Sequence, residues 1–375
     1  MGTAISVRID TKVTSGAKAG DKVEAVVVAP VLIGDRVLLP QGSRVTGSVK
    51  SATPAKPDAR AELLLDFVEL TLPGASKLPL AAKVAGLDNA RESVTGEGLI
   101  QGILASETLT ARIDQGLERL GARYAGFANF LGTVKGAVLQ KADTEITLEP
   151  GAELELSLTK ALDLADDHPI EKVMPIEPAA ELAALVDALP FQTTAEKPAK
   201  PSDVTNLMYI GTREQIEAAF KAAGWAASAE LNAVSGLETM RAVAEQRGYK
   251  EAPMSTLLLE GRPPELVFQK QYNTFAKRHH LRIFQRPEKF QGREVWVCAA
   301  THDTGIDFSP ENRTFIHKID PQIDRERAKV VFDLMFADKV EAVALVDRPK
   351  VPTSGENATG DKIETDGKMA VLALR

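Results

Sequence analysis

Residues 276–324 read AKRHHLRIFQRPEKFQGREVWVCAATHDTGIDFSPENRTFIHKIDPQID, and this stretch decides how the second half of the chain folds. The segments His280–Phe284 and Glu294–Ala300 are short apolar runs rich in β-branched and aromatic residues, which predicts two strands. Asp320-Pro321 then predicts the start of a helix that extends to about Ala337, with Asp320 as the N-cap. Four of the five histidines of the chain also lie here, so this is the first place to look for a functional site.

Around this stretch, helices and strands are mixed over residues 205–375. Thr212 and Gln215 have the spacing of a capping box at the start of a helix that Gly224 ends, and another helix is expected at Leu237–Arg247. Further strands are expected at Asn206–Ile210, Ser255–Leu259, Glu265–Phe268 and Val340–Val346. This order predicts a mixed α/β domain of the α+β class over residues 205–375.

The first half of the chain has a different pattern. Runs rich in Val, Ile and Leu are separated by turn residues such as Gly20-Asp21 and Pro73-Gly74, which predicts a β-barrel or β-sandwich over residues 1–165. The expected strands are Ala4–Thr11, Lys22–Ala29, Arg36–Leu39, Ser43–Ala52, Ala61–Leu72, Lys77–Gly86, Glu145–Leu148 and Glu153–Leu164. Residues 97–141 instead follow helical spacing, which predicts a helical insert. The whole chain is therefore expected to be an α+β multidomain protein.

Residues 166–204 separate the two predicted domains. Several prolines interrupt this segment, and Glu177–Leu189 is expected to form one short helix within it. The last part, Gln192–Asp203, has the composition of a linker.

The composition limits the classes of function. A length of 375 residues favours two domains, and a net charge of −7 argues against a general nucleic-acid binder. Cys298 is the single cysteine, which excludes an intramolecular disulfide framework and a thiolate metal cluster. No run of about 18 or more apolar residues is present, so no membrane-spanning helix is predicted. Because Gly2–Ile9 already alternates like a strand, we expect that an upstream signal or anchor segment is missing from this sequence.

The turns and strand ends of the first half form a recognisable set of motifs. They are Gly2-Thr3-x-Ile5, Ser15-Gly16, Gly20-Asp21, Leu39–Ser43, Gly47 and Leu148–Leu154. This set resembles the β-barrel domain of TrbI-type conjugation and type IV secretion proteins, over residues 2 to about 164. In that family a helical insert helps form an outer-membrane pore. The insert of this chain carries Arg112, Asp114, Glu118, Arg119 and Arg123, which favours a packed or partner-binding hairpin instead.

The second half contains a more specific set of motifs. They are Pro253-Met254-Ser255, Gly261-Arg262-Pro263, Phe268-Gln269-Lys270, Arg278–Arg282, Thr301–Gly305, His317–Asp320, Gly360-Asp361 and Thr365–Gly367. Their order over residues 205–375 resembles the LssY C-terminal domain family. The resemblance implies a bacterial protein that is associated with the cell envelope, in a family that sometimes accompanies phosphatase-like membrane domains. The resemblance therefore indicates a cellular location and a fold, and it implies no particular reaction mechanism.

The histidines and aspartates of residues 276–324 suggest a metal site. Imidazole and carboxylate groups suit zinc, iron or manganese, and metal-bound water can act as the nucleophile of a hydrolysis. If His279–Phe284 is a strand, His279 and His280 point to opposite faces, so only one of them can readily join such a site. The expected metal ligands are His302 and His317 with either His279 or His280, and the expected carboxylate ligand or catalytic base is Asp303 or Asp307.

Two other interpretations of the same residues stay open. In the first, the residues are structural: Asp303 and Asp307 flank a turn at Thr304-Gly305, and His279 is a hydrogen-bonded, partly buried imidazole. In the second, Arg278, His280 and Arg282 share a strand face and bind an anionic ligand such as a phosphate or carboxylate. A charged, solvated edge strand would have the same pattern as the anion site.

Two functional hypotheses follow from the sequence. The first is a binding or scaffold protein of the bacterial cell envelope or periplasm, whose partner is an envelope protein or an anionic ligand. The second is a metal-dependent hydrolase of phosphoesters that uses a divalent metal ion such as Zn²⁺ in the second domain. No nucleic-acid partner is expected, and the sequence does not decide whether the protein is an enzyme.

Overall fold

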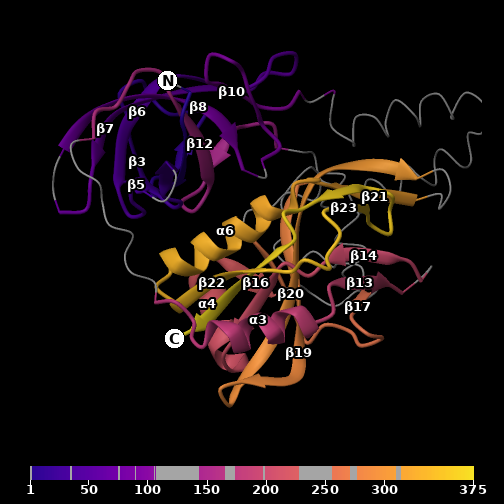
Figure 1. The fold of residues 1–375 in the computed structure, drawn as a ribbon. Helices are drawn as coiled ribbons and strands as arrows, with labels where there is room; N and C mark the ends of the chain where they lie inside the picture. The colour runs from indigo at the N-terminus through magenta and orange to yellow at the C-terminus, as the bar shows by residue number, and fades with distance from the viewer. Residues whose placement is uncertain are drawn as a thin grey trace, which may run out of the picture. The chain divides into compact units, whose positions relative to one another are not determined.

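The computed structural model describes residues 2–33, 36–74, 77–88, 90–104, 106, 143–164, 174–196, 199–227, 256–270, 277–309 and 314–375, with the backbone alone at 33, 36, 306–309 and 314–317. The chain divides into two compact units, the first with the described residues up to 164 and the second with those from 174 onward (Figure 1). The expected helix Leu237–Arg247 and residues 107–141 of the expected insert lie outside the described residues.

The first unit contains a closed barrel of six antiparallel strands. They are β1 (Ala4–Ile9), β3 (Lys22–Val27), β6 (Arg44–Thr53), β7 (Glu62–Thr71), β8 (Lys77–Leu87) and β12 (Glu153–Leu158). Their order is β6-β3-β1-β12-β8-β7, and the pairing of β6 with β7 closes the barrel. Alternate residues, such as Ile5, Val7 and Ile9 of β1, are buried and fill the interior. The predicted barrel is confirmed.

Short strands complete the first unit. They are β2 (Val13–Thr14), which pairs with β11 (Thr147–Leu148), β4 (Val31–Ile33), which pairs with β5 (Arg36–Leu39), and β10 (Leu99–Gln101), which pairs with β7 and β9 (Ser93–Val94). The expectation that helical structure begins at residue 97 was wrong, because Leu99–Gln101 extends the sheet. Ile100 is buried opposite Leu63, so its apolar side chain belongs to the barrel core.

An eight-stranded sheet organises the second unit. Its main path is β16 (Trp225–Ala227), β18 (Leu266–Lys270), β19 (Arg278–Phe290), β20 (Arg293–Ser309), β15 (Leu207–Ile210), β25 (Lys368–Leu374) and β22 (Val340–Asp347). The remaining strand, β21 (Thr314–Ile319), pairs with the far half of β20. β15 and β25 are parallel, and the other neighbours are antiparallel. This is the mixed architecture that the second half of the sequence predicts.

Within the described residues, three helices cover the two faces of this sheet. α4 (Arg213–Ala222) and α6 (Ile323–Phe336) bury Phe220, Val330 and Leu334 against one face, here called the α6 face. α3 (Ala179–Ala188) buries Leu182 and Val186 in a separate cluster against the other face. The capping box that the sequence predicts at Thr212 and Gln215 is present at the start of α4.

The segment expected to be a linker is partly ordered sheet. β13 (Gln192–Ala195) pairs with β14 (Pro201–Val204) and with β17 (Leu257–Leu258), so the expectation of a linker over Gln192–Asp203 was wrong for these strands. A further hairpin is formed by β23 (Ser354–Glu356) and β24 (Lys362–Glu364).

The start of α6 also differs from the expectation. The helix begins at Ile323, with Gln322 at the N-cap position. Asp320 Oδ1 accepts a hydrogen bond from the Gln322 backbone N–H at 2.9 Å, so the carboxylate closes a turn before the helix instead of capping it.

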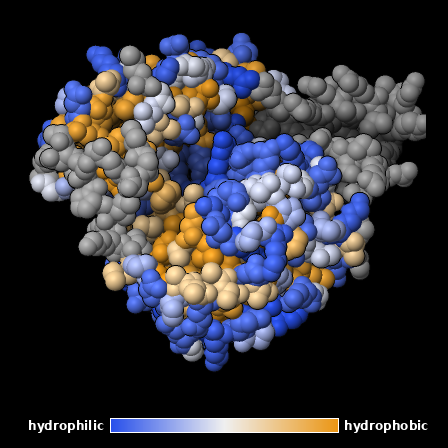
Figure 2. Space-filling view, viewed as in Figure 1, coloured by the Kyte–Doolittle hydropathy of each residue, from blue (hydrophilic) through white to orange (hydrophobic). Residues whose placement is uncertain are grey.

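The surface of the second unit is mixed in character. Hydrophilic residues cover much of its visible face, interrupted by a hydrophobic patch (Figure 2). Among the described residues of this unit, the exposed large hydrophobic side chains are Met174 and Leu345. Within the described parts of the chain, no helix has the length and apolar character needed to cross a bilayer.

Candidate functional site

The hairpin of β19 and β20 positions the histidines of the second unit. Gln291 and Gly292 at its turn both have positive φ, 49° and 79°, which fits the two-residue type I′ turn that suits the twist of paired strands. The register places His279 opposite His302, and it likewise aligns His280 with Thr301 and Arg278 with Asp303.

This register divides the predicted site residues between the two faces of the sheet. Opposed residues share a face and successive residues alternate, so His279 and His302 lie on the α6 face while His280 and Asp303 lie on the other. The prediction that His279 and His280 point to opposite faces is confirmed.

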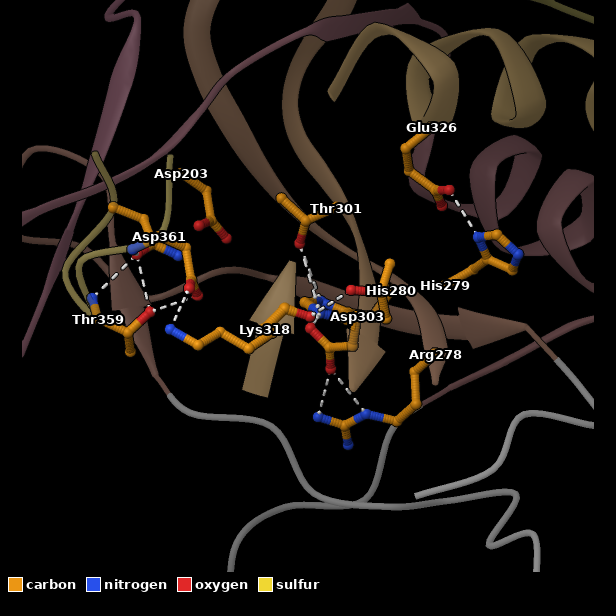
Figure 3. A network of polar contacts seen from close by, with 12 residues as sticks. Asp203, Arg278, His279, His280, Thr301, Asp303, Lys318, Glu326, Thr359 and Asp361 are labelled. Carbon is orange, nitrogen blue, oxygen red and sulfur yellow. Dashed lines mark hydrogen bonds and ion pairs between the residues drawn. The ribbon is translucent and has the colours of Figure 1, made fainter. Parts of the chain in front are cut away.

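Arg278, His280 and Asp303 form an ion-paired group, here called the ionic centre (Figure 3). Asp303 Oδ2 accepts a hydrogen bond from Arg278 Nε at 3.1 Å and lies 3.0 Å from Arg278 Nη2. Asp303 Oδ1 lies 2.9 Å from His280 Nε2, and since an ionised carboxylate only accepts, that nitrogen carries the proton. All three side chains are buried, so one carboxylate joins β19 to β20 inside the protein.

Arg282 connects the same face of β19 to β14. Its Nη1 donates to Asp203 Oδ2 at 3.2 Å, and both side chains are buried. Burial lowers the pKa of Arg282, and the nearby carboxylates of Asp203 and Asp303 oppose that effect. A guanidinium stays charged at neutral pH, so the two arginines predicted to bind an anion already face carboxylates of their own unit.

His279 and His302 form a second group, here called the histidine pair, on the α6 face. Their ring centroids are 4.1 Å apart and their planes are inclined by 19°. A ring nitrogen of His279 lies within 4.8 Å of one of His302. His279 is buried and His302 is half-buried, so the pair extends from the core toward the surface.

Glu326 of α6 holds the buried member of the histidine pair. Its Oε2 lies 2.6 Å from His279 Nδ1, and the two side chains are only 3% and 4% exposed (Figure 3). Its Oε1 is buried and has no hydrogen-bond partner among the described residues.

Glu326 is absent from the site residues that the sequence predicts, although the sequence contains a signal for it. Glu326 and Asp333 are seven residues apart, so they share one face of α6 with the apolar Ile323 and Val330. Acidic residues are rarely buried unless they have a partner, so two acids at this spacing on an apolar face point to buried contacts.

Asp333, the second buried acid of α6, has strong partners. Its Oδ2 accepts hydrogen bonds from Lys270 Nζ at 2.6 Å and from Trp225 Nε1 at 3.0 Å. Lys270 Nζ also lies 5.6 Å from the centre of the Trp225 ring, within the range of a cation–π contact. The charge of Asp333 is therefore compensated by a buried lysine.

His317 and Asp307 belong to the hairpin of β20 and β21. The backbone of His317 pairs with Ile306 and that of Asp307 with Ile316, and the side chains of His317 and Asp307 are not described. The position of Ile306 is four residues beyond His302, roughly 13 Å along an extended strand. The backbone therefore does not bring His317 next to His302.

The grouping of ligands differs from the predicted one in a second way. Asp303, which the sequence suggests as a carboxylate beside His302, lies on the opposite face of the sheet. The structure instead groups His302 with His279 and Glu326.

Comparisons with known proteins give one family and a distant structural likeness. Residues 186–369 match the LssY C-terminus family, which confirms the resemblance seen in the motifs of the second half. The chain is also similar to ComB10 of the Com type IV secretion system of Helicobacter pylori, at 14% identity and a TM-score of 0.23, over 42% of this chain and 85% of that chain. No curated protein sequence gives a significant match.

Proposed function

We propose that this chain is a binding or scaffold protein of the bacterial cell envelope. The match of residues 186–369 to the LssY C-terminus supports the envelope association, because resemblance to that family implies it. The observation that carries the binding or scaffold role is the ionic centre. Arg278, His280 and Asp303 are buried and paired with one another, in the manner of groups that hold a fold together.

The ionic centre and Arg282 connect three strands. Asp303 joins β20 to β19, and Arg282 joins β19 to Asp203 of β14, which belongs to a different sheet. Removing one partner of a buried ion pair costs about 3–5 kcal/mol, because the other charge is left uncompensated. These buried residues are ion-paired with each other, which suits the rigid interior of a binding or scaffold domain better than a reacting centre.

The proposal is tested in cells that express the chain from its own gene. Fractionation measures where the protein resides, and a lysine-reactive cross-linker applied before lysis captures its partners. We expect the chain in the envelope or periplasmic fraction, within discrete cross-linked complexes. Recovery of an uncross-linked monomer in the cytosolic fraction would contradict the proposal.

A metal-dependent hydrolase of phosphoesters is the second candidate, and the histidine pair favours it. Two adjacent imidazoles, one of them half-buried, can hold an ion whose bound water serves as a nucleophile. Asp303 lies across the sheet from His302, so Glu326 is the nearer carboxylate for this chemistry.

The hydrolase candidate is tested with generic phosphomonoesters and phosphodiesters in the presence of Zn²⁺ or Mn²⁺. It predicts turnover that His302→Ala removes. Absence of turnover with either ion, or turnover that His302→Ala leaves intact, would eliminate this candidate.

A further inference from the structure

We infer that His279 and His302 form a binding site for a divalent transition-metal ion, with Glu326 as the carboxylate that orients His279. This inference is independent of the proposed envelope role, since a metal ion can serve a binding protein or an enzyme. It depends on three observations: the strand register, the contact between His279 and Glu326, and the burial of Glu326.

The strand register supplies the two ligands. His279 and His302 are directly opposed on neighbouring antiparallel strands, so the backbone fixes the separation of their Cβ atoms. One ring nitrogen of His279 lies within 4.8 Å of one ring nitrogen of His302. The rings are stacked, with their planes inclined by 19°, so each must rotate about its side-chain bonds for both lone pairs to meet one ion at about 2.0–2.1 Å.

The contact with Glu326 fixes the proton on His279. Because a carboxylate only accepts, Nδ1 of His279 donates to Glu326 Oε2 across 2.6 Å. In the neutral imidazole the lone pair is then on Nε2. Most metal-binding histidines have this arrangement, in which a carboxylate holds the other ring nitrogen and raises the basicity of the ligand.

The burial of Glu326 is the third observation. Its carboxylate is 3% exposed, and Oε1 has no hydrogen-bond partner among the described residues. Asp333 lies two turns further along the same helix and has Lys270 as a buried cationic partner at 2.6 Å. A buried carboxylate is costly unless positive charge is near, and a divalent ion on His279 would supply that charge.

The site suits a particular class of ion. Two imidazoles with a carboxylate behind them favour Zn²⁺, Co²⁺, Ni²⁺ or Cu²⁺ over the hard ions Mg²⁺ and Ca²⁺. His302 is half-buried, which gives the ion a route from solvent. Two imidazoles fill part of a tetrahedral sphere, so water or an anionic group of a ligand can complete it.

The test uses the full chain and Zn²⁺ as the probe. Purified protein is stripped with a chelator, dialysed against micromolar ZnCl₂ and analysed for bound zinc, and its melting temperature is measured with and without the ion. We expect a single Zn²⁺ per chain, a higher melting temperature with zinc, and loss of stoichiometric uptake in His302→Ala. Glu326→Gln should weaken zinc affinity about 10–100-fold while retaining the two imidazoles.

His317→Ala is the matched control, because it removes a histidine whose backbone position is remote from His302 along β20. It should bind zinc as the wild type does. His302 is half-buried, so the melting temperature of His302→Ala without zinc should stay near that of the wild type, which separates ligand loss from unfolding. The inference is overturned if the wild type takes up no zinc, or if uptake survives His302→Ala or is lost in His317→Ala.

Discussion

His302 and Asp303 are neighbours in the chain with different surroundings. His302 stacks on His279 under α6, whereas Asp303 faces Arg278 and His280 on the other side of the sheet. The alternation of side chains along a strand is enough to separate them. At the scale of single residues, we therefore expect two adjacent substitutions to have unlike effects.

Asp303→Asn should destabilise the second unit strongly. The amide keeps the shape of the carboxylate but leaves the buried Arg278 guanidinium without its charged partner. We expect a loss of about 3–5 kcal/mol in the unfolding free energy of this unit, measured by urea denaturation.

Glu217→Gln is the control for the loss of a carboxylate in the same unit. Glu217 pairs with Arg213 on the surface of α4, where both side chains are about half exposed, and such pairs contribute at most about 1 kcal/mol. Equal effects of the two substitutions would show that the ionic centre does not stabilise the fold.

Asp366→Asn should alter the response of the protein to acid. The hydrogen bonds from Arg327, at 2.7 and 2.8 Å, hold the pKa of Asp366 below its usual value. The stabilisation is therefore complete above the unfolded-state pKa of about 3.9 and is lost as pH falls through the lower folded-state pKa. We expect the melting-temperature difference between wild type and variant to be constant above about pH 5 and to shrink below about pH 4.

The size of this acid effect should be modest, because the Asp366 side chain is 39% exposed. A gap between wild type and Asp366→Asn that widens toward low pH would contradict the assigned direction of the pKa shift.

At the scale of elements, the closure of the barrel between β6 and β7 depends on a close backbone approach. A Cβ atom at Gly47 would overlap the carbonyl oxygen of Asp66 and lie 2.9 Å from Phe67 Cδ1. The register of the two strands also shifts at this point, between Thr46 and Gly47. A residue without a side chain is needed where two backbones come this close.

Gly47→Ala should therefore destabilise the first unit by about 1–3 kcal/mol, measured by chemical denaturation. Gly86→Ala is the matched substitution in another strand of the same barrel. Its new Cβ would lie an ordinary 3.7 Å from the nearest atom, in Glu155, so it should be nearly neutral. Equal stability of the two variants would contradict the close approach of the β6 and β7 backbones at Gly47.

Local signals in the sequence predicted much of the fold. Thr212 and Gln215 are three residues apart and cap each other within one turn of α4, so their spacing alone identifies the helix start. Burial of Cys298 also follows from its apolar strand, and in the structure this burial raises the pKa of the thiol. The strands of the barrel follow from apolar alternation and turn residues for the same reason.

Features that depend on distant partners were not predictable in this way. β13 is a strand because β17, more than sixty positions away, pairs with it, and the polar Gln192–Ala195 segment gives no hint of that partner. Glu326 meets His279 only because α6 packs over β19. The separation of His279 and His280 followed from strand alternation alone, whereas the grouping of His302 with His279 and of Asp303 with Arg278 required the strand register.

At the scale of the whole molecule, each unit encloses a core of its own. Residues between Ile5 and Leu156 form the core of the first unit, and two clusters whose residues lie between Ile176 and Leu374 form the cores of the second. A chain with separate cores is not expected to unfold as one two-state system. Stability changes should then be assigned to one unit at a time.

Differential scanning calorimetry should accordingly resolve two transitions. Gly47→Ala should lower one of them and Asp303→Asn the other, because the two substitutions lie in different cores. A single cooperative transition that both substitutions shift equally would contradict the division into two folding units.

The most direct test of the division of His302 and Asp303 between the two faces compares His302→Ala with Asp303→Asn. Zinc uptake is measured at a temperature where both variants are folded, and the melting temperature of each is measured in parallel. We expect His302→Ala to lose zinc uptake with little change in the melting temperature of the zinc-free protein. Asp303→Asn should melt at a lower temperature and still bind zinc. Loss of zinc uptake in Asp303→Asn at an unchanged melting temperature, with uptake intact in His302→Ala, would contradict the assignment of the two faces.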